Sequence, residues 1–230
     1  MANSNEQSTN EITSKSEVFF QKNGKAILIA AIAVVLIIAG YFCYKSFISA
    51  PREEKASTAI ARGQDYFNSE QFDKALNGDG AGYPGFIKIA SDYSSTKAGN
   101  LANLYAGLCY AQLDKWQDAV KFLEEYSPAK DAMVSPAAVQ ALGNAYAHVG
   151  QVDKAIDKLK DAAKKADSKA NDGENNSLSP TFLLQAGQLL ESQNKQDEAL
   201  KIYQDIKKKY TNSMLVQSNE IDKYIERTKK

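Results

Sequence analysis

The distribution of apolar residues divides the chain into three parts and predicts a different structure for each. Residues 1–17 are polar and rich in Asn, Ser and Thr, a composition that predicts a disordered tail. Residues 26–44 form a run of 19 residues without a charge. From residue 49 to residue 230, apolar residues recur at helical spacing between polar turns, which predicts a domain of amphipathic helices.

The uncharged run predicts a retained transmembrane helix over 26–44, within a membrane anchor over 18–48. At about 1.5 Å per residue a helix of this length matches the hydrocarbon core of a bilayer. Ten of its residues are Ile, Leu, Val or Phe, and Tyr41, Phe42 and Tyr44 suit one membrane interface. A cleaved signal peptide is the alternative, but its apolar region is normally shorter and is not followed by a residue such as Lys45.

The charges around this run do not select a side of the membrane. Three lysines precede the run within about 20 residues, and four basic residues follow it within the same distance. The numbers of basic residues on the two sides are therefore nearly equal, and the positive-inside rule does not give the orientation.

Glycines recur through the third part of the chain at matching places in a longer pattern. Gly63, Gly107, Gly143 and Gly187 are spaced 44, 36 and 44 residues apart. An alanine follows each of them after twelve residues, and a polar turn lies between glycine and alanine. Because glycine inside a helix costs about 1 kcal/mol relative to alanine, four glycines at matching places indicate a packing requirement. We interpret each as the point where two antiparallel helices cross closely.

The pattern predicts an all-α fold, in which a single transmembrane helix precedes an α-solenoid of about four helical hairpins and a C-terminal capping helix. Two segments account for the longer glycine spacings of 44 residues: 77–85 inside the first hairpin and 165–180 after the third. Both are interpreted as solvated insertions. The hairpins are expected at about 52–93, 97–127, 135–166 and 179–210, and the capping helix at 213–228.

Charge and reactive residues argue against several classes of function. The chain has 28 basic and 28 acidic residues with no block of one sign, which gives no footprint for nucleic acid. His148 is the only histidine, and the two cysteines, Cys43 and Cys109, have no zinc-site spacing. The glycine-rich segment 77–85 lacks the Lys-Ser/Thr ending of a P-loop. We therefore expect no catalytic residue, no cofactor and no metal, and function through a binding surface.

The inner face of such a solenoid is lined by the first helix of each hairpin, and two rows of residues are candidates for partner binding. Neither row holds a lysine or arginine, so a clamp for a carboxylate is not expected, and leucines and amides suit an apolar helix or an extended segment. The alternative that the leucines pack between hairpins and bind no partner stays open. One row contains Ile60, Leu104, Gln140 and Leu184, and the other contains Gln64, Leu108, Asn144 and Gln188.

The repeats resemble the tetratricopeptide repeat, which has a period of 34 residues, and the stretch LGNAYAHVGQVDKAI over 142–156 resembles it best. The opening FFQKNGKA over 19–26, followed by a span and repeats, is similar to the YfgM-like family, an ancillary subunit of the bacterial SecYEG translocon. That resemblance implies a single pass through the bacterial inner membrane, a cytoplasmic N-terminus and a periplasmic repeat domain.

The implied partners are translocon subunits, periplasmic chaperones or unfolded clients. Segments 86–110 and 202–213 also resemble repeats of envelope-assembly proteins. The alternative function, a scaffold for outer-membrane assembly, cell division or gliding, therefore stays open. Formation of a homo-oligomer also stays open.

Overall fold

The computed structural model describes the backbone of residues 3–229 and the side chains of residues 21–229, and in that part of the chain it contains helices and no strand. The chain divides into two compact units, residues 1–52 and residues 53–230. Each unit is described by itself below. The all-α class predicted from the pattern of apolar residues is confirmed.

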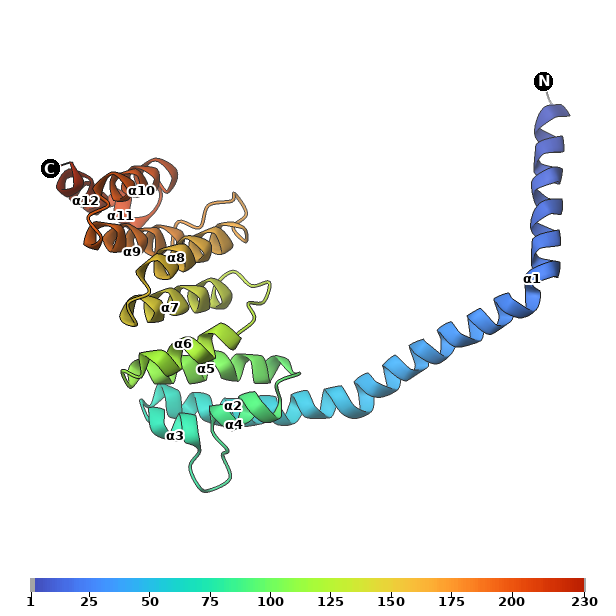
Figure 1. Cartoon of the computed structure of the whole chain (residues 1–230), viewed down its shortest axis with the longest axis horizontal. Coiled ribbons are helices and arrows are strands. Elements are labelled where there is room, and N and C mark those ends of the chain that lie inside the picture. The colour runs from blue at the N-terminus through green and yellow to red at the C-terminus, as the bar shows by residue number, and fades with distance from the viewer. Residues whose placement is uncertain (1–2, 230) are drawn as a thin grey trace. The chain divides into compact units, whose positions relative to one another are not determined.

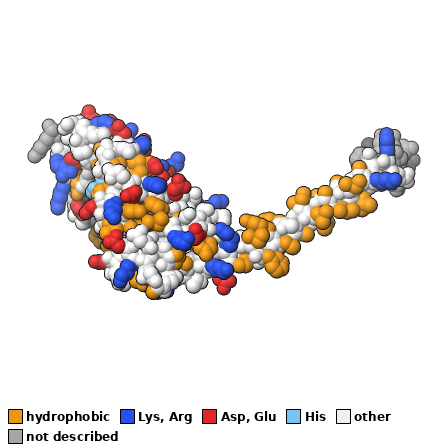
Figure 2. Space-filling model, turned by 60° about the horizontal axis from the view of Figure 1, so that its bottom comes forward, with side chains coloured by type: hydrophobic (Ala, Val, Ile, Leu, Met, Phe, Trp, Pro, Cys, Tyr) orange, Lys and Arg blue, Asp and Glu red, His pale blue; other side chains and the backbone are white. Residues whose placement is uncertain are grey.

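The first unit consists of α1 (Asn3–Tyr44) and a short π-helical segment, η1 (Lys45–Ser49), before the start of α2. Among the described residues, one helix, counted from Gln21, is long and apolar enough to cross a membrane, and none of its most apolar window is buried within the chain. Figure 2 shows hydrophobic side chains over most of the surface of this helix. The expected disordered tail, 1–17, lies where no side chain is described; it stays a prediction, although α1 runs from Asn3.

The second unit is a stack of helical hairpins, visible as successive layers from α2 to α12 in Figure 1. The helices of this unit are α2 (Ala50–Asn68), α3 (Phe72–Asn77), α4 (Phe86–Asp92), α5 (Lys97–Gln112), α6 (Trp116–Glu125), α7 (Val134–His148), α8 (Val152–Asp167), α9 (Ser179–Ser192), α10 (Gln196–Lys209), α11 (Met214–Gln217) and α12 (Glu220–Thr228). The predicted solenoid of four hairpins with a C-terminal cap is therefore present. The cap is two short helices rather than one, because Asn219 adopts a left-handed conformation with φ of 57°.

Three of the four repeated glycines lie where the two helices of one hairpin cross. A Cβ added at Gly107 would lie 2.5 Å from Leu123 Cγ, and one added at Gly143 would lie 3.1 Å from Leu159 Cγ. The added atom at Gly187 would lie 2.7 Å from Cζ of Tyr203. In each case the contacting residue follows its glycine by sixteen positions. The glycine therefore makes room for one bulky side chain of the second helix.

The turn inside each hairpin repeats as closely as the crossing does. The residue seven positions after each glycine has a positive φ: Glu70 (58°), Asp114 (56°), Gly150 (77°) and Asn194 (61°). The next residue donates its backbone N–H to the carbonyl of the residue three positions after the glycine, at 2.8–3.0 Å. This left-handed residue ends the first helix and reverses the chain.

The first hairpin departs from this plan because insertion 77–85 interrupts its second helix. Helix α3 stops at Asn77, and the loop that follows projects from the stack in Figure 1 before α4 resumes the helix. A Cβ at Gly63 would meet Phe86 Cε1 at 2.5 Å, and Tyr83 from the insertion lies against the same point. The crossing is therefore filled by residues 20 and 23 positions after the glycine.

Buried side chains form neighbouring clusters along the stack rather than one central core. Each cluster joins one hairpin to the next, as expected for a repeat array in which each hairpin buries its apolar faces against its neighbours. Polar contacts also join hairpins: the carboxylate of Glu53 on α2 accepts the N–H groups of Lys97 (2.7 Å) and Ala98 (2.9 Å) at the start of α5.

Candidate protein-binding groove

A groove of about 350 Å³ lies between α5 and α7, the first helices of the second and third hairpins. Its walls are Leu108 and Ala111 from α5, the N-terminal residue of α6, Trp116, and Gln140, Ala141, Asn144, Ala147 and His148 from α7. We call this the α5–α7 groove. None of its lining residues is an Asp, Glu, Lys or Arg, so the groove favours an uncharged or apolar ligand surface.

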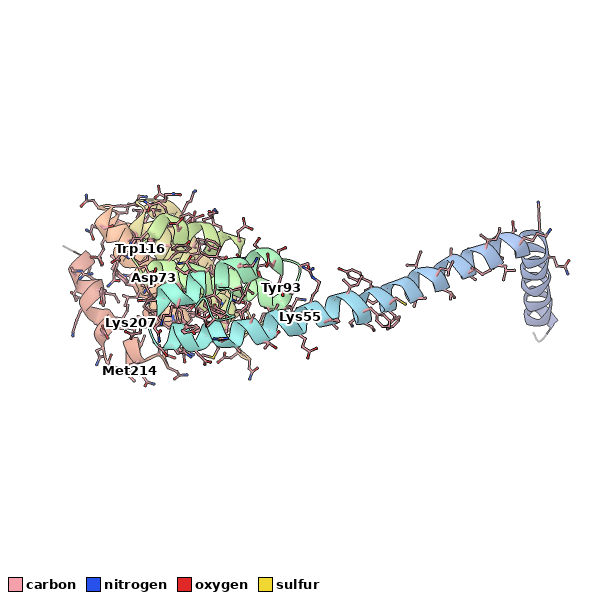
Figure 3. The ribbon with its side chains drawn as sticks, turned by 90° about the horizontal axis from the view of Figure 1, so that it is seen from below. Lys55, Asp73, Tyr93, Trp116, Lys207 and Met214 are labelled. Atoms are coloured by element: carbon pink, nitrogen blue, oxygen red, sulfur yellow. The ribbon has the colours of Figure 1, made fainter. Side chains whose placement is uncertain are left out.

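One wall of the groove is a flat aromatic pair. The indole of Trp116, labelled in Figure 3, stacks on the imidazole of His148 with ring centroids 3.6 Å apart and planes 4° from parallel. Trp116 begins α6 directly after the left-handed turn at Asp114, and His148 ends α7 directly before the turn that contains Gly150. Two turns of neighbouring repeats therefore hold the rings together.

The amide of Asn144 lies in the groove without a hydrogen-bond partner among residues 21–229. An amide side chain has two donors and two acceptor sites. Asn144 is partly exposed, so water can satisfy its amide in the free protein and a ligand group can replace that water. A peptide group has one donor and one acceptor, so it can satisfy the amide. The three alanines of the groove leave room for a backbone to approach.

Three of the eight residues predicted to bind a partner are core residues instead. Ile60 and Leu104 are each 5% exposed and Leu184 is 9% exposed, and each belongs to a buried cluster between hairpins. The packing interpretation left open for the leucines therefore holds for Leu104 and Leu184. Since these side chains are enclosed by the stack, a partner cannot reach most of their surface.

Three predicted amides join one layer of the stack to the next, two of them between hairpins and one between the last hairpin and the cap. Gln64 Nε2 donates to the Tyr105 hydroxyl of the next hairpin at 2.9 Å. Gln140 donates to Gln185 at 3.0 Å, and Gln188 donates to the Tyr224 hydroxyl at 3.4 Å. Between α5 and α7, residues 21–229 show no such side-chain bond, and the groove lies there. Of the eight residues, Leu108, Gln140 and Asn144 line the groove.

Sequence reasoning missed the aromatic pair. His148, the only histidine of the chain, is exposed, and its ring is stacked on Trp116. A signal existed: Trp116 stands nine positions after Gly107 and His148 five positions after Gly143, so both flank the hairpin turns. Bringing them together requires knowing how one hairpin is stacked on the next, which the repeat spacing alone does not specify.

Residues 21–229 contain no group of three or more His, Cys, Asp or Glu side chains that could hold a metal ion. Carboxylates of the stack also hold neighbouring helices together. The carboxylate of Glu124 on α6 accepts a hydrogen bond from the hydroxyl of Tyr146 on α7. Burial of Tyr146 and, to a smaller extent, this carboxylate raise the pKa of Tyr146 to about 12. This contact joins the second hairpin to the third.

A stack of helical hairpins with an uncharged groove between first helices is the architecture of a protein-interaction scaffold. The model of the tetratricopeptide repeat-like domain family matches residues 17–221, and the chain belongs to that family. No curated protein matches the sequence. The resemblance seen in the repeats is thereby confirmed at the level of the tetratricopeptide-repeat class.

Proposed function

We propose that the chain is a membrane-anchored scaffold of the bacterial cell envelope and that its α5–α7 groove binds an uncharged, partly apolar segment of a partner protein. The observation that carries this proposal is the free amide of Asn144 beside the Trp116–His148 stack. The amide would pair with a peptide group of the segment, and the indole and Leu108 would contact an apolar side chain.

The membrane part of the proposal rests on the exposed apolar helix and on the segment 19–26. Ten Ile, Leu, Val or Phe residues in 26–44 favour insertion by about 3–6 kcal/mol. The FFQKNGKA opening resembles proteins whose N-terminus is cytoplasmic and whose repeats are periplasmic. We therefore place the repeat unit in the periplasm, where translocon subunits, chaperones or unfolded clients would be its partners.

A reporter fused after Lys230 tests the topology. Alkaline phosphatase, which is active in the periplasm, should be active in the fusion, and a fluorescent protein that folds only in the cytoplasm should stay dark. The reverse pair of results would contradict the proposed orientation.

Crosslinking in intact membranes tests the partners. The full-length chain is crosslinked and purified, and captured proteins are quantified for the wild type, the groove variant W116A/N144A and the matched surface variant K121A on α6. Loss of two central contacts at a binding site typically costs at least about tenfold in affinity. We expect translocon or chaperone proteins with the wild type and K121A, and depletion with the groove variant.

Equal capture by all three chains would exclude the α5–α7 groove as the binding site. Groove-dependent capture of outer-membrane assembly, division or gliding proteins would favour the alternative, a scaffold for another envelope complex, which the resemblance of segments 86–110 and 202–213 supports.

A further inference from the structure

A second hollow lies on the second helices of the last two hairpins, away from the residues of the α5–α7 groove. It measures about 450 Å³ and is lined by Lys160, Ala163 and Lys164 of α8, Leu183 of α9, and Lys209 and Tyr210 at the end of α10. We call this the basic hollow. A neighbouring depression of about 520 Å³ shares Leu183, Lys209 and Tyr210 with it, so the two adjoin.

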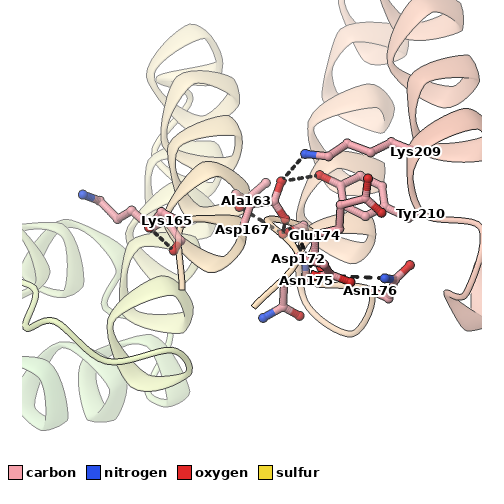
Figure 4. A network of polar contacts seen from close by, with 11 residues as sticks. Ala163, Lys165, Asp167, Asp172, Glu174, Asn175, Asn176, Lys209 and Tyr210 are labelled. Carbon is pink, nitrogen blue, oxygen red and sulfur yellow. Dashed lines mark hydrogen bonds and ion pairs between the residues drawn. The ribbon is translucent and has the colours of Figure 1, made fainter. Parts of the chain in front are cut away.

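The acidic side chain in the basic hollow is already neutralised. Asp167 accepts hydrogen bonds from Lys209 Nζ (2.5 Å), the Tyr210 hydroxyl (2.8 Å), the Ser179 hydroxyl (2.6 Å) and the backbone N–H of Asn175 (2.9 Å). Figure 4 shows Lys209 and Tyr210 reaching Asp167 from α10. Because Asp167 and Lys209 cancel each other, neither is left to balance further charge.

Two lysines of the basic hollow have no such partner. Lys160 and Lys164 lie one helical turn apart on α8, both are exposed, and neither has a carboxylate partner among residues 21–229. By contrast Lys165 on the same helix pairs with Asp161 at 3.8 Å. The hollow therefore presents two uncompensated positive charges above an apolar floor that contains the half-buried Leu183.

The second insertion supplies one wall of the basic hollow. Gly173 lines it, with a φ of 75° that a side chain would strain, and Glu174 lines the adjoining depression. The turn is held by Asp172, which accepts the N–H of Glu174 at 3.1 Å, and by Asn175, which accepts the N–H of Leu178 at 2.9 Å. The insertion thus makes a concave site from what would otherwise be the flat outer side of two helices.

We propose that the basic hollow docks an acidic protein segment that carries an apolar side chain, and that this occurs independently of the α5–α7 groove. The carboxylates of the segment would face Lys160 and Lys164, and its apolar side chain would contact Leu183. A flat anionic membrane surface would meet the lysines but would leave the recessed floor empty, so the concavity favours a protein segment.

Fluorescence anisotropy with a labelled peptide tests this proposal on the full-length chain in a non-ionic detergent. The probe is a peptide of about a dozen residues that alternates Glu with Leu or Phe and has both ends blocked. The comparison peptide has every Glu replaced by Gln, so it keeps the apolar residues. The chains are the wild type, K160E/K164E and the matched control K201E, which changes an exposed lysine of α10 outside the basic hollow.

We expect the Glu peptide to bind and the Gln peptide to bind at least about tenfold more weakly. Reversing two charges at an exposed site should weaken binding by about tenfold or more at an ionic strength of about 0.15 M, and K201E should match the wild type. The substituted lysines are exposed and make no ion pair, so K201E should melt as the wild type does. K160E/K164E should melt only slightly lower, because it places a negative charge in the last turn of α8.

Equal binding of the Glu and Gln peptides, or equal binding by the wild type and K160E/K164E, would overturn the proposal. So would failure of the Glu peptide to bind the wild type at all, because the two lysines would then face solvent or lipid rather than a protein segment. The groove variant W116A/N144A should bind the Glu peptide as the wild type does, so failure of this proposal and failure of the α5–α7 groove are distinguishable.

Discussion

The two insertions of this chain are each organised around one aspartate, yet they do opposite things to the fold. Asp79 in 77–85 accepts hydrogen bonds from Arg62, the Tyr66 hydroxyl and the backbone N–H groups of Ala81 and Tyr83. Asp167, beside 168–178, accepts from a lysine, a tyrosine, a serine and a backbone N–H. Of the predicted insertion 165–180, residues 168–178 lie between α8 and α9 and the rest belong to those helices. The first insertion contributes a buried side chain, Tyr83, whereas no residue of 168–178 is buried.

The position of each insertion explains the difference. The first one falls inside the second helix of a hairpin, so it removes the residue that would fill the crossing at Gly63, and Tyr83 and Phe86 fill that space instead. The second falls between α8 and α9, where both helices are complete, so it can stay on the surface and form the wall of the basic hollow. An insertion within a packed element must therefore rebuild the core, whereas one between elements is available for function.

The largest effect should come from emptying the rebuilt crossing. Tyr83 is 3% exposed, and its hydroxyl donates to the carbonyl of Ala75 at 2.7 Å. Y83A should lower the free energy of unfolding by about 3–5 kcal/mol, because removing a buried aromatic ring leaves a cavity. Y83F keeps the ring and loses one hydrogen bond, so it should cost about 0.5–1.5 kcal/mol. Chemical denaturation of the full-length chain measures both. Equal costs for Y83A and Y83F would contradict the packing role of the ring.

Acid should destabilise both insertions together. The backbone N–H of Tyr83, then the Tyr66 hydroxyl, lower the pKa of Asp79 to about 2. Burial raises the pKa of Asp167, but Lys209 and Ser179 outweigh it and the net shift is downward. Since both folded pKa values lie below the unfolded value of about 3.9, this stabilisation is present above about pH 4 and is lost as pH falls towards 2.

A pH series of denaturation curves measures this loss. D167N should remove about 1.5–3 kcal/mol at neutral pH, because hydrogen bonds to a charged group are lost, and should flatten part of the acid dependence. An unchanged acid dependence in D167N would mean that Asp167 does not contribute to it. N171A, at an exposed position of the same loop, is the matched control and should follow the wild type.

The next effect concerns stability at the glycine crossings, where substitutions in the first and third hairpins should have different costs. G143L should cost about 1–3 kcal/mol because the added side chain meets Leu159 and the carbonyl of Ala155. G63L should cost more, since its space is closed by two aromatic rings. Thermal and chemical unfolding of the two variants, compared with surface variant K121A, checks the order. An unchanged melting temperature for G143L would mean that the crossing is not closely packed.

The smallest expected effect concerns the turns. Gly150 has a φ of 77°, and G150A should cost about 1 kcal/mol because a Cβ strains that conformation. At the equivalent place in the first hairpin Glu70 already has a φ of 58°, so E70G should relieve strain and have a smaller effect of the opposite sign. Opposite signs in denaturation midpoints would confirm the equivalence of the turns, and the same sign for both would contradict it.

The glycine pattern predicted the hairpin crossings because a close helix contact needs the same small residue at the same place in every repeat. Partners at Gly107, Gly143 and Gly187 lie at one fixed distance along the chain, so periodicity reveals them. The partners of Gly63 break that spacing, and no local signal marks Tyr83 as a core residue. Irregular packing of this kind depends on tertiary contacts.

The candidate surface was only partly predictable for a related reason. Leu104 and Leu108 lie four positions apart on one helix face, yet one is buried by the next hairpin and the other lines the α5–α7 groove. Which of them is covered depends on how α5 and α7 pack. The stacking of Trp116 on His148 depends on the same packing, so neither could be predicted from the spacing within a single repeat.

Site-specific photo-crosslinking in intact cells can establish whether the α5–α7 groove binds a partner protein. A photo-reactive amino acid replaces Ala141, which lines the groove, or Asp157, which is exposed on α8 outside the hollows described above. If the groove binds a partner, position 141 should give discrete crosslinked protein bands and position 157 little or no product. Equal products from both positions, or none from position 141 while position 157 crosslinks, would contradict it.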